Sequence, residues 1–148
     1  MTAEVPVSIG ARIPERRFGP ITAQMLVRYS GVSGDLNPMH YDQEFARAAG
    51  YPGVFSQGMH HAALLATVVS DLYGAERVRR FLAQFKDQVW LGDELLCRGE
   101  ITAARPAAGG TLVSIALTVT TGPDRVVLEG EADVLVAGEA SGALTEDG

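Results

Sequence analysis

The sequence predicts an α+β fold in which an antiparallel sheet wraps around one long helix. Residues 59–73, between two glycines, are apolar on nearly every face, and such a helix must be surrounded by other protein. Four later segments alternate apolar and polar residues with a period of two, as strands do: 81–89, 95–103, 113–119 and 126–136. Short, turn-like links between these segments predict antiparallel neighbours.

The chain before the long helix is expected to be mostly irregular, with two short helices. Several prolines among its first residues suit an extended arm that contains one short strand at 16–18. Thr22 is a suitable N-cap for a helix at 23–31, and Asp42 for a helix at 43–49.

Length and composition indicate a single globular domain. The 148-residue chain is 47% hydrophobic and 20% charged, and it is long enough to bury a core without stabilising disulfides or metal ions. We expect the domain to occupy residues 1–137 and the small and acidic residues 138–148 to form a disordered tail. The net charge of −6 argues against a nucleic-acid partner.

The sequence also suggests a compartment. Its one cysteine, Cys97, excludes an intramolecular disulfide and fits a reducing environment. The N-terminus has no pattern of a secretory signal, and the longest apolar stretch, 62–69, is too short to span a bilayer. We therefore expect a cytoplasmic protein without a membrane partner.

Residues 29–46 carry the functional signal. Asp35, Asn37 and His40 fall within six residues, and Gly34 and Pro38 predict that they lie on a rigid turn. Acid–base catalysis requires a carboxylate and an imidazole in fixed mutual geometry. Asp and Asn also favour Asx turns and helix caps, so the residue types alone leave a purely structural role open.

This segment resembles the hydratase motif of the MaoC-like enoyl-CoA hydratases and dehydratases. The motif has an aromatic residue, a small residue, G-D-x-N-P, an aliphatic residue, a histidine and a small residue six positions later. The matching positions are Tyr29, Ser33, Gly34, Asp35, Asn37, Pro38, His40 and Ala46. Met39 departs from the branched aliphatic residue usual in the family. The resemblance covers roughly residues 5–137 and implies a hot-dog fold.

The resemblance implies an (R)-specific hydratase or dehydratase of enoyl or 3-hydroxyacyl thioesters. Asp35 and His40 would handle the two protons of the reaction, with a water between them, and Asn37 would hold their geometry. Which of the pair moves which proton is left open. In the family, the glycine that opens the central helix stabilises the thioester oxygen. Gly58 stands at the family's spacing, eighteen residues after His40.

Candidate substrate-binding residues surround this glycine: Phe55, Ser56, Gln57 and Met59. Relatives commonly have histidine where this chain has Gln57. A basic cluster that includes Arg77 and Arg79 is either a solvated patch or a landing site for the phosphates of coenzyme A or of a carrier-protein arm. Acyl-CoA or acyl carrier protein is thus the expected partner, and no cofactor is predicted beyond the substrate's own carrier group.

No metal site is predicted. His60 and His61 are adjacent, and adjacent helical side chains point about 100° apart, so the two cannot readily hold one ion. His60 either lines the substrate pocket or serves packing.

Two other functions are compatible with a hot-dog fold. Thioesterases of this fold commonly place a carboxylate within the central helix, where this chain has only Asp71, near the far end. A non-catalytic acyl-binding subunit of a heteromeric dehydratase has usually lost the pair that Asp35 and His40 form. Relatives pair into a dimer with a continuous sheet, so we expect a homodimer, with a heterodimer as the alternative.

Overall fold

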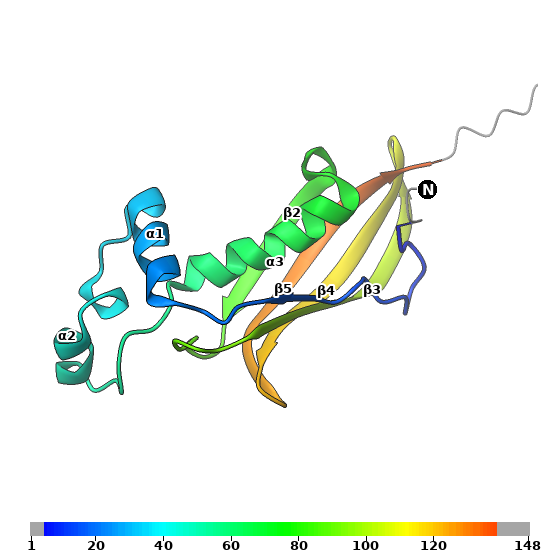
Figure 1. Cartoon of the computed structure of the whole chain (residues 1–148). Helices are drawn as coiled ribbons and strands as arrows, with labels where there is room; N and C mark the ends of the chain where they lie inside the picture. The colour runs from blue at the N-terminus through cyan, green and yellow to red at the C-terminus, as the bar shows by residue number, and fades with distance from the viewer. Residues whose placement is uncertain (1–4, 139–148) are drawn as a thin grey trace, which may run out of the picture.

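The computed structural model describes residues 5–138 as a curved antiparallel sheet with one long helix along its concave face (Figure 1). The strands are β1 (Arg16–Phe18), β2 (Val78–Phe85), β3 (Leu95–Ala107), β4 (Gly110–Thr121) and β5 (Arg125–Ala137), in the spatial order β1-β3-β4-β5-β2. The helices are α1 (Ala23–Ser33), α2 (Gln43–Ala48) and α3 (Gly58–Tyr73), with the short 3₁₀ helices η1 (Pro38–His40) and η2 (Ala75–Arg77). The predicted α+β architecture is confirmed.

The inner face of the sheet is the apolar face that the alternation predicts. In β4, Val113, Ile115, Leu117 and Val119 are at most 1% exposed. Ile115 lies opposite Ala132 of β5, and Val119 lies opposite Leu128. Because both central strands turn their apolar residues to the same side, they form a continuous surface on which α3 packs.

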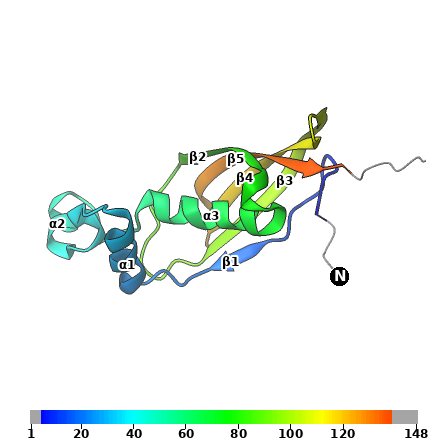
Figure 2. The same cartoon turned by 90° about the horizontal axis from the view of Figure 1, so that it is seen from above.

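The helix α3 is buried on one side only. Its buried residues are His61, Ala62, Leu65, Val68, Val69 and Tyr73. Met59 is 60% exposed, and Ala63 is also exposed. The expectation that this helix is surrounded therefore holds for the face toward the sheet, whereas its other face lies at the surface of the single chain (Figure 2).

The second strand begins and ends earlier than predicted. β2 covers Val78–Phe85 rather than 81–89. The ladder stops where the backbone amide of Lys86 donates to the carbonyl oxygen of Val127, while Val89 beyond it is fully buried. Val89 lies in the segment that connects β2 to β3. Because this buried apolar residue continues the alternating pattern of the strand, the sequence alone predicts a strand that ends too late.

The expected pairing of this strand with the next one along the chain was wrong. β2 pairs with β5, and β3 lies between β1 and β4. The turn-like link at Gly92 is a turn, since the amide of Asp93 donates to the carbonyl oxygen of Trp90, but it belongs to a crossover across the sheet. A turn signal reports a local reversal of the chain and leaves open which strands become neighbours.

The smaller elements follow their capping residues. Thr22 accepts a hydrogen bond from the amide of Met25 and starts α1, which is two residues longer than predicted. Asp42 accepts from Glu44 and Phe45 and starts α2, which is one residue shorter. No helix within the described chain is long and apolar enough to cross a membrane. All but the first residue of the predicted disordered tail, 138–148, lies outside the described residues.

Candidate active site

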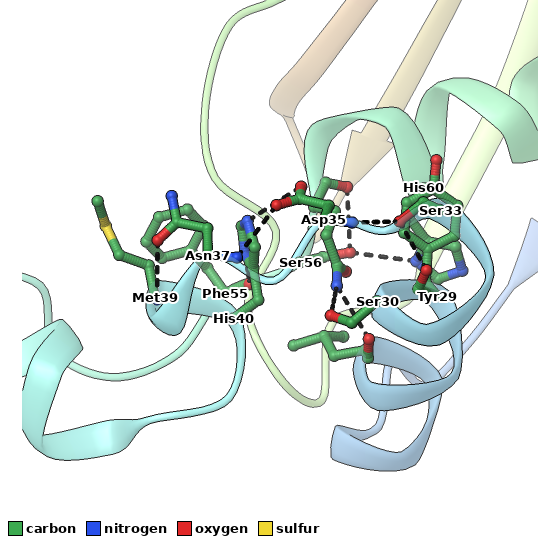
Figure 3. A network of polar contacts seen from close by, with 12 residues as sticks. Tyr29, Ser30, Ser33, Asp35, Asn37, Met39, His40, Phe55, Ser56 and His60 are labelled. Carbon is green, nitrogen blue, oxygen red and sulfur yellow. Dashed lines mark hydrogen bonds and ion pairs between the residues drawn. The ribbon is translucent and has the colours of Figure 1, made fainter.

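The turn after α1 is built by short-range hydrogen bonds. Gly34 ends the helix with a left-handed backbone, φ 75°, which glycine adopts without steric cost. The Ser33 hydroxyl donates to the carbonyl oxygen of Tyr29 over 2.7 Å and accepts from the amide of Asp35 over 3.1 Å. These bonds fix the backbone that carries the Asp35 side chain (Figure 3).

Asn37 supports the same turn. Its backbone amide donates to Asp35 Oδ1 over 3.3 Å, and its side-chain Oδ1 accepts from the backbone amide of Met39 over 3.1 Å. Asn37 thereby caps η1, whose last residue is His40. The side chain thus shapes the turn on which Asp35 and His40 lie, and its role in catalysis stays a prediction.

His40 is held by a contact that spans fifteen residues. Its Nδ1 lies 2.7 Å from the carbonyl oxygen of Phe55, and its Nε2 lies 3.6 Å from Asp35 Oδ2 (Figure 3). Because a carbonyl only accepts hydrogen bonds, Nδ1 must carry the proton, and Nε2 of the neutral ring then presents a lone pair toward Asp35. The 3.6 Å separation is longer than a direct hydrogen bond, so the two groups face each other without bonding.

Burial differs between the two members of this pair. The His40 side chain is 8% exposed, whereas that of Asp35 is 44% exposed. The ring of Phe55 meets His40 edge-on, at 5.4 Å and 86°, and also contacts Tyr51 and Trp90. This aromatic cluster fixes the imidazole plane and shields one side of it from water, while Asp35 stays open to solvent.

The start of α3 carries no side-chain cap. The side chain of Gln57, in the N-cap position, makes no hydrogen bond to the helix, whereas its backbone carbonyl oxygen accepts from the amide of His60 over 3.0 Å. Its Nε2 instead donates to the carbonyl oxygen of Leu26 over 2.9 Å and to the Ser30 hydroxyl over 2.8 Å. Among residues 5–138, the first turn of α3 thus has no side-chain cap, and its amides carry the partial positive charge of the helix terminus.

The placement of Gln57 corrects its predicted role. We expected a substrate-binding side chain, but Gln57 is 0% exposed and is bonded to α1. It ties α1 to the start of α3 and does not line the neighbouring cavity. The two hydrogen bonds of the Gln57 side-chain amide direct it away from a substrate. They also keep Gly58 in place relative to the turn after α1.

A cavity of about 240 Å³ lies beside Gly58. Its lining residues are Phe55, Ser56, Gly58, His61, Phe85, Lys86, Asp87 and Gln88. A Cβ added to Gly58 would lie 3.0 Å from Phe85 Cε1, so the ring would have to shift by a few tenths of an ångström to accommodate it. Of the predicted substrate-binding residues, Phe55 and Ser56 line this cavity, whereas Met59 does not.

Several lining residues were missed as candidate site residues. His61 stands three positions after Gly58, and residues at this spacing share a helix face, so the helical pattern offered a signal for it. Lys86 was considered only as the far end of the basic cluster. Asp87 and Gln88 belong with it to the connecting segment after β2, and no local motif marks them. They reach Gly58 only because β2 ends at the N-terminal end of α3.

The two adjacent histidines face different surroundings. His60 Nδ1 lies 3.1 Å from the Ser56 hydroxyl, and its ring contacts Tyr29 at 5.2 Å (Figure 3). His61 meets the ring of Phe85 edge-on at 5.8 Å. Within the described chain, no three His, Cys, Asp or Glu side chains gather as a metal site requires.

The predicted phosphate-binding arginines lie at the other end of α3. Arg77 and Arg79 follow this helix, which spans about 24 Å. Arg77 approaches Glu76 at 3.7 Å, and Arg79 donates to the carbonyl oxygen of the same residue. Within one chain they therefore do not contribute to the cavity beside Gly58, and their role toward a substrate phosphate stays a prediction.

Comparison with known proteins identifies the family. The model of the MaoC like domain matches residues 5–122, and the chain belongs to this family. A mitochondrial 3-hydroxyacyl-[acyl-carrier-protein] dehydratase of Arabidopsis thaliana is 31% identical over 132 residues, which cover 88% of this chain and 78% of that protein.

Two further relatives bear on size and fold. The fatty acid synthase subunit beta of Aspergillus oryzae is 38% identical over 110 residues, 72% of this chain; this match spans only 5% of that protein. The structure of an (R)-hydratase from A. caviae aligns with a TM-score of 0.77 at 23% identity and covers 88% of this chain and 97% of that one. This likeness confirms the hot-dog fold.

Proposed function

We propose that this chain catalyses the reversible addition of water to an enoyl thioester, giving an (R)-3-hydroxyacyl thioester carried on coenzyme A or on an acyl carrier protein. The observation that carries the proposal is the pairing of Asp35 with His40 Nε2 across 3.6 Å, with Nδ1 bonded to the carbonyl oxygen of Phe55. Membership of the MaoC-like hydratase and dehydratase family supports it.

The geometry supports the handling of one water molecule. In the tautomer that Phe55 imposes, both Asp35 and His40 Nε2 are hydrogen-bond acceptors. A water held beside the pair can donate a hydrogen to either acceptor, which leaves its lone pairs available to the β-carbon of the substrate. As the C–O bond forms, one of the two acceptors takes a proton, and a proton is delivered to the α-carbon.

The N-terminal end of α3 suits the stabilisation of negative charge on the substrate. Negative charge develops on the thioester oxygen as the enolate-like transition state forms, and preorganised amides stabilise such charge. The uncapped first turn of α3 begins at Gly58, whose lack of a side chain allows a carbonyl to approach closely. The reaction as proposed uses no cofactor beyond the carrier group of the substrate.

We also propose that two copies pair through the edge of the sheet. β2 is the outermost strand and has β5 as its one partner within the described chain. Leu82 and Phe85 on this strand are 44% and 48% exposed, and Met59 on α3 is 60% exposed. Pairing of β2 with a second copy would satisfy its free backbone edge and cover these side chains.

The proposed pairing is tested by light scattering, which is expected to give the mass of a dimer. A monomeric mass at micromolar concentration contradicts this pairing.

The proposed reaction is tested with crotonyl-CoA, by following the loss of enoyl absorbance. Asp35→Asn and His40→Ala are each expected to lower kcat by about 10²–10⁴-fold, the usual contribution of a general acid or base. Asp42→Asn is the matched control, because Asp42 lies in the same loop but caps α2 and does not contact His40. It should retain kcat.

Two results would contradict the proposal. One is the absence of turnover by the unmodified chain with enoyl thioesters of several lengths on both carriers. The other is turnover that survives in Asp35→Asn and His40→Ala at the level of Asp42→Asn.

A further inference from the structure

Unsatisfied polar atoms concentrate at the N-terminal end of α3. Three buried side-chain atoms lack a hydrogen-bond partner within the described chain: Gln57 Oε1, His61 Nδ1 and His61 Nε2. Buried polar groups are nearly always bonded, because an unmade bond costs about 1–3 kcal/mol. His61 is the more unusual case, since neither nitrogen of its ring is bonded.

A hydrogen-bond partner can reach His61 only from the side of the cavity. The residue is 2% exposed, and Phe85 meets its ring edge-on at 5.8 Å. On its remaining side the imidazole lines the 240 Å³ cavity that also reaches Gly58 and Ser56. A helical side chain leans toward the N-terminus of its helix, which brings the ring of His61 beside Gly58, three residues earlier.

His61 is uncharged under physiological conditions. Burial, with a smaller contribution from repulsion by His60, lowers the pKa of His61 to about 4. The neutral ring offers one N–H donor and one lone pair. Lys86 and Asp87 line the same cavity, but Lys86 pairs with Glu129 and Asp87 with Arg125, so neither is directed at the imidazole.

We propose that His61 donates a hydrogen bond to an uncharged oxygen of the thioester substrate, in the cavity beside Gly58 and outside the reacting enoyl unit. His61 is then a substrate-binding residue that favours thioesters with an oxygen at this position. Two parts of the substrate carry such an oxygen: the amide groups of the carrier arm, and a hydroxyl or carbonyl on the acyl chain.

This inference rests on the proposed function for the identity of the ligand as a thioester. Its test therefore uses saturated thioesters, which bind without reacting. Dissociation constants are measured by calorimetry for hexanoyl-CoA and 6-hydroxyhexanoyl-CoA with the full chain and with His61→Leu and His61→Gln. Turnover of crotonyl-CoA by the unmodified chain is measured in parallel and reports on the proposed function separately.

The expected loss in His61→Leu is about tenfold in affinity, the effect of one hydrogen bond to a neutral group. An equal loss for both ligands assigns the oxygen to the carrier arm, and a loss confined to 6-hydroxyhexanoyl-CoA assigns it to the acyl chain. In His61→Gln the side-chain amide can donate again, so part of the affinity should return. Leucine removes the unsatisfied ring, so His61→Leu should unfold at no lower temperature than the unmodified chain.

His60→Leu is the matched control, since His60 does not line the cavity. It should leave both dissociation constants within about twofold, less than the effect of one hydrogen bond. Unchanged affinity of His61→Leu for both ligands overturns the inference. Failure of either ligand to bind the unmodified chain, or an equal loss in His60→Leu, overturns it as well.

Discussion

The two ends of α3 differ in how their polar groups are satisfied. At the C-terminal end, Asp71 pairs with Arg16, and the Tyr73 hydroxyl donates to the carbonyl oxygen of Pro6 over 2.8 Å. At the N-terminal end, the helix has no side-chain cap, and atoms of Gln57 and His61 are buried without partners within residues 5–138. One end has its side-chain polar groups paired, and the other leaves backbone amides and buried side-chain atoms unbonded within residues 5–138.

This difference shows where the fold gives up stability for chemistry. Uncapped amides and unbonded imidazole nitrogens cost free energy in the absence of a ligand. They lie beside the turn that holds Asp35 and His40, so the cost falls where the proposed reaction occurs. The four changes below test this contrast, from the largest expected effect to the smallest.

The largest effect is expected from Gly58→Ala. The new Cβ would lie 3.0 Å from Phe85 Cε1, and it would hinder the approach of a thioester carbonyl to the first amides of α3. We expect kcat for crotonyl-CoA to fall by about 10²–10³-fold, as for the loss of an oxyanion donor. The control is Gly31→Ala in α1, where a Cβ meets nothing within 4 Å. Equal activity of the two variants would show that the proposed reaction does not require a residue without a side chain at position 58.

Gln57→Ala should lower stability. It leaves the carbonyl oxygen of Leu26 and the Ser30 hydroxyl without their donor in a buried site, which costs about 2 kcal/mol in the free energy of unfolding. Urea unfolding measures the loss. Gln24→Ala, an exposed glutamine in α1, should change the free energy by less than about 0.5 kcal/mol. A similar small change in Gln57→Ala would contradict the tie between α1 and α3.

The pH dependence of stability should report the burial of His61. Its pKa is lowered from 6.5 to about 4 in the folded chain, so the unfolded chain binds more protons between these values. Stability therefore falls as the pH drops from 6.5 toward 4, by up to about 1.4 kcal/mol per pH unit. Burial also lowers the pKa of His60, which adds a contribution of the same sign.

Urea unfolding at several values between pH 7 and pH 4.5 tests this dependence against His61→Leu. The variant should lose stability less steeply, because only the contribution of His60 remains among these two residues. Parallel curves for the two proteins would show that His61 is not held neutral by the fold.

The smallest effect is expected at the other end of the helix. Asp71→Asn breaks an exposed ion pair with Arg16 and should lower the free energy of unfolding by less than about 1 kcal/mol. Its turnover of crotonyl-CoA should equal that of the unmodified chain. Arg16→Gln is the matched control and should behave alike. Loss of hydrolytic activity in Asp71→Asn alone would instead favour a thioesterase that activates water from this carboxylate.

The part of the site that sequence predicted is the part built from local contacts. The bonds that shape the turn join residues two to four positions apart, from Tyr29 to Met39. Such turns depend on Gly, Ser, Asp and Asn at fixed offsets, so their residues are visible in the sequence. Gly58 was predicted from the resemblance, by the family's spacing after the histidine, together with its place at the start of an apolar segment.

The sequence by itself determined the strand and helix segments to within a few residues, the apolar face of the sheet and the proposed catalytic residues. The tertiary structure decided that β2 pairs with β5, that Phe55 fixes the tautomer of His40, and that Gln57 is bonded to α1. It also brought residues 86–88 and His61 to one cavity. The reason is that periodicity and turn chemistry act over a few residues, whereas these contacts join segments whose separation along the chain says nothing about their distance in space.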